Sequence, residues 1–211
     1  MIEVENLEFR YRSGGEELFG GLSHAFPAGS VSVITGPSGR GKSTLLYMLG
    51  LLLTPTSGVI RVADEETGLL SDSARSRLRA KHIGFVFQDA ALDDSRPVLD
   101  NIVEGALYGG IPRATAETTA RDLLVRLGVT LREDHKPGEV SGGQAQRVGL
   151  CRALVKHPKL ILADEPTGNL DAESASVVLN ELETAARAGA TVVIASHDPR
   201  IVEMADDALA L

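Results

Sequence analysis

The sequence contains almost no cysteine, which limits how the fold can be stabilised. A single cysteine, Cys151, permits no disulfide within the chain, as is usual for proteins of a reducing compartment. Cys151 lies in a helical pattern among Val148, Leu150 and Val155, and free cysteines in such surroundings behave as small apolar residues. We therefore expect Cys151 to be buried and assign it no chemical role.

Positive charge is also scarce. The chain has 21 Lys and Arg against 29 Asp and Glu, which gives a net charge of −8 at pH 7. This balance argues against a broad nucleic-acid-binding surface and against attachment to anionic lipid by charge alone. We interpret the basic run at residues 75–82 as a solvated helix face and predict no nucleic-acid partner.

No hydrophobic run has the length of a membrane span. The most apolar stretch, "LLYMLGLLL" at residues 45–53, is far shorter than the roughly 20 residues that a spanning helix needs. The N-terminus, "MIEVENLEFR", lacks the layout of a signal peptide. We expect a cytoplasmic chain without direct membrane insertion, so that any membrane contact is made through a protein partner.

The length and the order of the strand-like and helical runs predict an α/β fold. The 211 residues suffice for one large domain, or for a core with a subdomain, and contain no repeat, low-complexity tract or Gly/Ser linker. Helical stretches alternate with β-rich runs, as a mostly parallel sheet covered by helices requires. Helices are expected at about 42–51 and at 72–82. Strands are expected at residues 2–9, 31–35, 56–64 (an edge strand or hairpin), 83–88, 159–165 and 191–197.

Between residue 89 and about residue 157 the strand signal disappears. Three stretches in this region, 98–110, 114–128 and 141–157, have helical periodicity. We therefore predict a helical subdomain inserted into a nucleotide-binding core. The predicted division is 1–88 for the first part of the core, 89–158 for the helical subdomain and 159–211 for the second part of the core.

The segment "GPSGRGKST", residues 36–44, matches the phosphate-loop pattern G-x-x-x-x-G-K-[ST]. In such a loop, backbone N–H groups surround phosphate oxygens, Lys42 reaches the β and γ phosphates, and the Ser43 hydroxyl coordinates magnesium. A flexible glycine-rich turn is the alternative, but the expected strand before and helix after favour a nucleotide site. The predicted nucleotide-binding residues here are Gly36, Pro37, Ser38, Gly39, Arg40, Gly41, Lys42, Ser43 and Thr44.

Two adjacent acids end a second buried strand. The run "LILADE" finishes with Asp164 and Glu165, directly before Pro166. Because the strand ends and the chain turns there, we expect Asp164 to bind the magnesium shell while Glu165 faces the γ-phosphate and polarises the attacking water. The alternative is a pair of solvated acids at a strand end.

A second segment, "VSGGQAQRV" at residues 140–148, also has the features of a phosphate site. Ser141 suits the N-cap of a helix, Gly142 and Gly143 allow close approach of a ligand, and a helix N-terminus carries about half a positive charge. One small chain is not expected to bind two nucleotides, so this second site needs its own explanation.

Together with "FVFQD" containing Gln88, "NLD" ending in Asp171 and "ASHD" containing His197, these motifs resemble the ATP-binding subunit of ABC transporters. They occur in the order and at about the spacing of that family, and the match covers residues 2 to 209. The resemblance implies a P-loop NTPase core with a mostly parallel sheet, an N-terminal antiparallel β portion and an inserted α-helical subdomain.

The resemblance also explains the second phosphate site. In this family two chains pack head to tail, and Ser141, Gly142, Gly143 and Gln144 of one chain would close over the ATP held by the phosphate loop of the other. The implied activity is hydrolysis of ATP to ADP and phosphate with Mg²⁺. The implied partners are a second copy of the chain and an integral-membrane permease on the cytoplasmic face of the cell membrane.

Four single residues receive roles only from the resemblance. Tyr11 would stack on adenine, Gln88 would link magnesium and the attacking water to the subdomain interface, Asp171 would act across the dimer, and His197 would contact the γ-phosphate. The alternatives from the residues alone are a strand-end aromatic for Tyr11, a strand cap for Gln88 and a structural histidine for His197.

Within the family, "ADEPTGNLD" and "TLLYMLGLLLTPTSG" resemble the subunits for lipoprotein release, macrolide or peptide export and cell division, written LolD, MacB and FtsE. Three features depart from the pattern: Val140 in place of leucine, the acidic segment 89–97, and an end at Leu211 where relatives commonly continue. A non-transport ABC ATPase and another P-loop enzyme, such as a kinase or GTPase, are the alternatives. The acidic single cassette disfavours the first, and "SGGQ" with the acid pair disfavours the second.

Overall fold

The computed structural model describes residues 1–11, 16–62 and 65–211, and over these residues the chain forms two sheets. One sheet is antiparallel, in the order β2-β1-β4-β5, and the other is parallel, in the order β6-β7-β8-β3-β9. The antiparallel strands are β1 (Ile2–Phe9), β2 (Leu18–Phe26), β4 (Ser57–Val62) and β5 (Glu65–Glu66). The parallel strands are β3 (Val31–Thr35), β6 (Ile83–Val86), β7 (Leu160–Asp164), β8 (Thr191–Ala195) and β9 (Asp207–Ala210).

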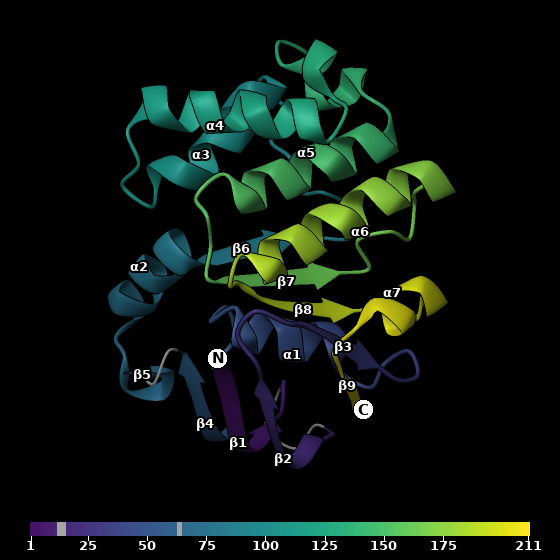
Figure 1. Cartoon of the computed structure of the whole chain (residues 1–211). Coiled ribbons are helices and arrows are strands. Elements are labelled where there is room, and N and C mark those ends of the chain that lie inside the picture. The colour runs from purple at the N-terminus through teal and green to yellow at the C-terminus, as the bar shows by residue number, and fades with distance from the viewer. Residues whose placement is uncertain (12–15, 63–64) are drawn as a thin grey trace.

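Helices cover both faces of the parallel sheet (Figure 1). The α-helices are α1 (Lys42–Leu49), α2 (Asp72–His82), α3 (Val98–Leu107), α4 (Arg113–Arg126), α5 (Gly142–Leu154), α6 (Ala172–Arg187) and α7 (Pro199–Met204). Short 3₁₀ turns lie at Thr67–Leu69, Thr130–Arg132 and Pro137–Glu139. Figure 1 shows α5 and α6 on one side of the parallel sheet, and α1 with the antiparallel sheet on the other. Within the described ranges, no helix is both long and apolar enough to cross a bilayer.

The central parallel strands are apolar throughout because both of their faces are buried. In β7, Ile161 and Ala163 join the core formed with α3, α4, α5 and α6, whereas Leu160 and Leu162 join the core formed with α1 and β1. This alternation follows from the two-residue period of a strand. The sheet is therefore held rigidly between two cores, and its carboxyl edge is a firm support for a binding site.

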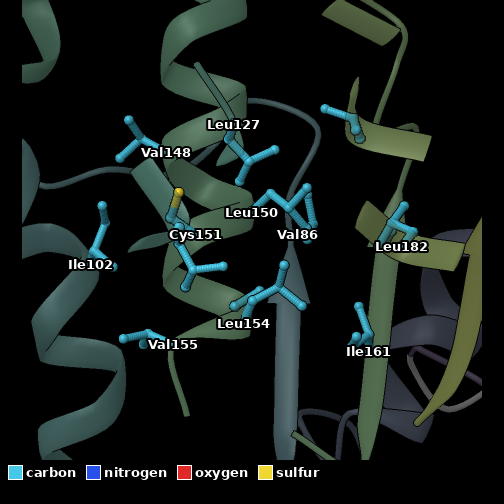
Figure 2. Close-up of a cluster of buried hydrophobic side chains, with 14 of the residues drawn as sticks. Val86, Ile102, Leu127, Val148, Leu150, Cys151, Leu154, Val155, Ile161 and Leu182 are labelled. Atoms are coloured by element: carbon cyan, nitrogen blue, oxygen red, sulfur yellow. The ribbon is translucent and has the colours of Figure 1, made fainter. Parts of the chain in front are cut away.

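Cys151 belongs to the first of these cores. Figure 2 shows its sulfur within the cluster that α5 forms with its neighbours, with Ile102 and Val148 among the labelled side chains. The side chain is fully buried, and burial raises the pKa of the thiol well above its ordinary value. The predicted burial of Cys151 is confirmed.

Most predicted elements are confirmed within three residues, but the antiparallel sheet shows one difference. The segment predicted at 56–64 as an edge strand or hairpin is β4, which lies between β1 and β5 and pairs antiparallel with β5, the hairpin alternative; Ala63 and Asp64 of that prediction lie outside the described residues. Strand β2 was not predicted, because two glycines with positive φ, Gly20 and Gly21, interrupt its apolar pattern.

The region between residues 89 and 157 contains helices and, over this fully described stretch, no strand, as predicted. Helix α5 packs directly on β6, since a Cβ on Gly84 would lie 2.6 Å from the Ala153 carbonyl oxygen. Helix α2 has no buried residue, which confirms the exposed helix face expected from its charges. The division of the chain at residues 88 and 158 stays a prediction.

Candidate functional site

A cleft of about 800 Å³ opens at the carboxyl edge of the parallel sheet. Parallel strands end on the same side, and the arrowheads of β3, β7 and β8 point to this edge in Figure 1. The lining residues come from both sides of the predicted helical subdomain in the sequence, and none lies between residues 89 and 163: Tyr11, Leu18, Gly36, Pro37, Ser38, Gly39, Gly41, Lys42, Ser43, Thr44, Gln88, Asp164, Glu165, Gly168, Asn169 and His197.

The loop between β3 and α1 forms one wall of the cleft. Gly36, Gly39 and Gly41 have φ angles of 138°, 84° and 95°, which residues with a Cβ rarely adopt. Gly41 is the N-cap of α1, and among the described residues no side chain caps this helix start. The first N–H groups of α1 are therefore directed toward the cleft, where they are available to an anion.

Lys42 is folded back on its own loop. Its Nζ donates hydrogen bonds to the carbonyl oxygens of Gly36 (2.9 Å) and Pro37 (3.0 Å). These bonds keep the ammonium over the concave side of the loop. A phosphate placed there would meet both the ammonium group and the backbone N–H groups.

The acid pair occupies the opposite wall. Asp164 is the last residue of β7 and is buried, while Glu165 has a left-handed backbone with φ 44° and donates its N–H to the Ala195 carbonyl (2.9 Å). A left-handed non-glycine residue costs on the order of 1 kcal/mol. Because of this turn, both carboxylates line one cleft, although neighbours within a strand would face opposite sides.

The Glu165 carboxylate is held by two neighbours from the end of β8. The Ser196 hydroxyl donates to Oε2 (2.8 Å), and His197 Nδ1 lies 2.8 Å from Oε1. Ser196 is fully buried, whereas the His197 side chain is 84% exposed. Sequence reasoning missed Ser196; the motif "ASHD" placed it next to His197, but nothing in the motif showed that it contacts Glu165.

Burial raises the pKa of the Asp164 carboxyl, and the charge of Glu165 adds to the rise. A hydrogen bond from Ser43 and the charge of Lys42 act in the opposite direction. Asp164 is thus a buried carboxylate with a neighbouring hydroxyl, in a position where a cation would favour its ionised form.

The loop after Glu165 is fixed by Asp198. The Thr167 hydroxyl donates to the Asp198 carboxylate (2.9 Å), and hydrogen bonding from Arg200 lowers the pKa of Asp198 to about 2. This ionised carboxylate keeps Gly168 and Asn169 at the cleft, two lining residues that sequence reasoning did not select.

Tyr11 and Gln88 border the cleft from two other segments. The Tyr11 hydroxyl lies 2.7 Å from the Thr44 hydroxyl oxygen, and the Tyr11 side chain is 64% exposed. Gln88 follows β6 by two residues and is exposed. An exposed aromatic ring beside the phosphate loop and an exposed amide at a strand end are both accessible to a ligand.

The segment Ser141–Gln144 does not line this cleft. Ser141 is the N-cap of α5: its hydroxyl accepts from Gln144 N (3.2 Å), and the Gln144 side chain accepts from Ser141 N (2.9 Å). The predicted N-cap position of Ser141 is confirmed. Ser141 and Gly142 are exposed, so the start of α5 faces away from the core.

Asp171 lies beside this helix start. A Cβ on Gly143 would lie 3.3 Å from the Leu170 side chain, so the start of α5 and the start of α6 are neighbours. Asp171 caps α6 by accepting from the backbone N (2.8 Å) and the hydroxyl (2.9 Å) of Ser174, and these bonds lower its pKa.

The cleft therefore brings together most of the predicted site residues, but not all of them. The predicted residues that line it are Tyr11, Gly36, Pro37, Ser38, Gly39, Gly41, Lys42, Ser43, Thr44, Gln88, Asp164, Glu165 and His197. The predicted residues outside it are Arg40, Ser141, Gly142, Gly143, Gln144 and Asp171.

A scan against family models matches residues 19–168 to the ABC transporter family. The chain belongs to this family. LolD of Paramagnetospirillum magneticum, a lipoprotein-releasing system ATP-binding protein, is 37% identical over 99% of this chain and 96% of its own length. LolD 1 of Rhodospirillum rubrum is 43% identical over 88% of this chain and 83% of its own length. MacB of Salmonella choleraesuis, a macrolide export ATP-binding/permease protein, is 42% identical, but the chain spans only 32% of MacB.

Solved ABC cassettes have the same fold. The dimeric ATP-binding cassette MJ0796, solved in a post-hydrolysis state with ADP and phosphate, superposes with a TM-score of 0.91. It is 30% identical, and the alignment covers 100% of this chain and 94% of that chain. The chain is thus an ATPase subunit of the ABC transporter family, of the LolD and MacB type, and the predicted family, fold class and activity are confirmed.

Proposed function

We propose that this ABC ATPase hydrolyses Mg-ATP at two sites shared between two copies of the chain, and that the resulting closure of the dimer drives a membrane permease. One observation carries the proposal: the phosphate loop and the acid pair line one cleft, while the Ser141–Gln144 helix start lies outside it, with Ser141 and Gly142 exposed. A helix N-terminus built for an anion but turned outward serves a nucleotide on another molecule.

Within the cleft, the chain's own residues divide the work. Backbone N–H groups of the phosphate loop and the Lys42 ammonium bind the β and γ phosphates. To do so, Lys42 exchanges its hydrogen bonds to the Gly36 and Pro37 carbonyls for bonds to phosphate oxygens. Tyr11 stacks on the adenine ring. Glu165 accepts a proton from the attacking water, and Ser196 keeps its carboxylate oriented. His197 turns from Glu165 to the γ-phosphate.

Three side chains of the cleft offer oxygen ligands suited to a magnesium ion. Ser43, Gln88 and Asp164 offer hydroxyl, amide and carboxylate oxygens on one cleft, and Mg²⁺ prefers such hard oxygen ligands. When bound, the ion neutralises charge on the phosphates. Asp164 already carries a carboxyl whose ionised form is disfavoured by burial, which a cation would reverse.

The partner-facing side of the chain contributes the second half of each site. Ser141, Gly142, Gly143 and Gln144 would meet the γ-phosphate held by the other copy, with N–H groups and the helix dipole as the attractive elements. Asp171 lies next to them and would act across the same interface.

A second cleft, which we call the docking cleft, is the proposed permease surface. It encloses about 620 Å³ between α2, α3, α5 and β6, with Leu52, Phe85 and Tyr108 as apolar lining and with Arg77 and Lys156 as cations. Leu52 and Tyr108 are 49% and 72% exposed, so apolar surface is open to a partner. We place there an amphipathic cytoplasmic segment of the permease that carries an acidic side chain.

The names of the relatives suggest a class of cargo. Relatives are named for lipoprotein release and for macrolide export, and we propose an exporter or lipoprotein-release role for this chain. The chain would then sit peripherally on the cytoplasmic face of the cell membrane, held there by the permease.

The docking cleft yields a testable prediction. Leu52→Glu places a charge on exposed apolar surface of this cleft, so we expect a folded protein that binds ATP normally but loses at least about tenfold in affinity for its permease, as burial of an unpaired charge requires. The measurement is co-purification with the multi-span membrane protein encoded by the neighbouring reading frame.

Leu69→Glu is the matched control. Leu69 is 84% exposed and does not line the docking cleft, so its variant should co-purify like the parent chain. If the Leu52→Glu and parent chains co-purify equally with the membrane protein, the permease binds at another surface of the chain. A neighbouring membrane protein that binds neither form, and leaves ATP turnover unchanged, would contradict the transport-coupled function.

A further inference from the structure

The two clefts meet at the end of β6. Phe87 lines the docking cleft, and the next residue, Gln88, lines the ATP cleft. The chain then passes through Ala90 and Ala91, whose φ angles are 60° and 46°. A left-handed backbone is unfavourable for any residue with a Cβ, and two in succession persist only where the surroundings impose them.

Helix α5 imposes this turn through Arg152. Its guanidinium donates from Nη2 to the Ala90 carbonyl (2.6 Å) and from Nη1 to the Ala91 carbonyl (2.5 Å). The planar guanidinium thus bridges the carbonyl oxygens of both left-handed residues, a geometry that a lysine ammonium does not reproduce.

Two further residues on the same face of α5 contact the segment. The Gln146 amide donates to the Phe87 carbonyl (3.0 Å), and a Cβ on Gly149 would lie 3.4 Å from the Ala90 backbone. Gln146, Gly149 and Arg152 are spaced by three, so they form one stripe along the helix.

Arg152 is a costly residue to place there. Burial lowers the pKa of its guanidinium, with the charges of Glu104 and Asp89 opposing that shift. Arg152 is partly buried, and a cation that loses part of its hydration needs hydrogen-bond acceptors; the two carbonyls of the turn accept from its Nη1 and Nη2. The placement of Arg152 on α5 is therefore explained by its hydrogen bonds to the Ala90–Ala91 turn.

We propose that Arg152 is a positioning residue: by holding the Ala90–Ala91 turn, it sets the place of Gln88 in the ATP cleft. Arg152 also lines the docking cleft, and Ser141 caps the N-terminus of the same helix, so one rigid element joins Gln88 to the proposed permease surface and to the partner's nucleotide. The inference rests on the proposed role of Gln88 at the magnesium and the attacking water.

The first experiment compares Arg152→Gln with the parent chain. Loss of the two hydrogen bonds from the guanidinium should displace Gln88. We therefore expect kcat to fall by about 10- to 100-fold, the range that follows from small misplacements in an active site. The Mg²⁺ concentration for half-maximal turnover should rise, while ATP affinity without Mg²⁺ stays within about twofold. Arg152→Lys should not restore activity, because an ammonium cannot span both carbonyls.

Relief of the strained turn provides a rescue. Ala91 is exposed, and glycine adopts a left-handed backbone without steric cost, so Ala91→Gly in the Arg152→Gln chain should recover part of kcat and of the Mg²⁺ response. A purely structural Arg152 would change the melting temperature without changing the Mg²⁺ requirement. If Arg152→Gln does not fold, Gln146→Met removes one bond to the same segment and should shift the Mg²⁺ response in the same direction.

A double-mutant cycle separates this proposal from the proposed function. If Arg152 acts through Gln88, Gln88→Ala and the Gln88→Ala/Arg152→Gln double variant should have nearly equal kcat. Additive losses would overturn the positioning role and leave the Gln88 role standing. Parent-like turnover of Gln88→Ala would overturn both. Arg126→Gln, which breaks an ion pair with Glu181 on α6, is the control expected to behave like the parent.

Discussion

Replacing Glu165 by glutamine will lower ATP hydrolysis by about 10²- to 10⁴-fold, the usual contribution of a general base, while Mg-ATP binding is kept. A neutral amide cannot take the proton of the attacking water. The amide oxygen can still accept from Ser196, and the left-handed backbone at residue 165 is unchanged, so the cleft keeps its shape. Single-turnover hydrolysis and ATP binding, measured on the same preparation, test this.

The same variant should accumulate as an ATP-bound dimer. Removing one negative charge beside the γ-phosphate lowers repulsion across the closed interface, and without hydrolysis the closed state does not reopen. Size-exclusion chromatography with Mg-ATP should show a dimer for Glu165→Gln and a monomer without nucleotide. Glu203→Gln, at an exposed position of α7, is the charge-matched control. A Glu165→Gln chain that stays monomeric and hydrolyses ATP at the parent rate would exclude Glu165 as the base.

Contiguous motifs account for the parts of the site that the sequence predicted well. The phosphate loop is nine consecutive residues that run from the end of β3 into the first turn of α1, so its conformation is decided locally by Gly36, Gly39 and Gly41. The N-cap of α5 is equally local, because Ser141 and Gln144 satisfy each other. Such short-range rules need no knowledge of the fold.

Contacts between distant residues account for what was missed. Strand β9 has only the four residues Asp-Ala-Leu-Ala, which carry no clear strand pattern, and it is a strand because β3 pairs with it in parallel. The position of the Glu165 carboxylate depends on Ser196, 31 residues away, and the Ala90–Ala91 turn depends on Arg152, more than 60 residues away. Hydrogen bonds of this range leave no periodic signal in the sequence.

The shared-site model makes the second large prediction, from two variants that each disable one half of a site. Lys42→Ala removes the phosphate-loop ammonium, and Ser141→Arg blocks the helix start that faces the partner. Each variant alone should be nearly inactive, since every site in its dimers carries a lesion. Neither side chain fills the core, since Ser141 is exposed and Lys42 is partly exposed; loss of the Ser141 cap costs about 1 kcal/mol, so both proteins should keep their circular-dichroism spectrum.

Mixing the two variants in equal amounts should restore activity. Half of the dimers then contain one chain of each kind, and in each of these one site combines the sound loop of one copy with the sound Ser141–Gln144 segment of the other. About a quarter of all sites are therefore intact, as expected for two equivalent sites related by a two-fold axis. If turnover requires both sites, nucleotide-dependent dimerisation with one trapped ATP replaces phosphate release as the measurement.

A matched mixture distinguishes this from a nonspecific effect of concentration. Lys42→Ala mixed with the Lys42→Ala/Ser141→Arg double variant contains no sound loop, so it should stay inactive at every ratio. If the loop and the helix start of one chain served the same nucleotide, each chain would keep its lesion after mixing and exchange of partners would repair nothing. A mixture of the two single variants as inactive as its components, in turnover and in dimerisation, would therefore show that the outward-facing start of α5 does not complete the partner's site.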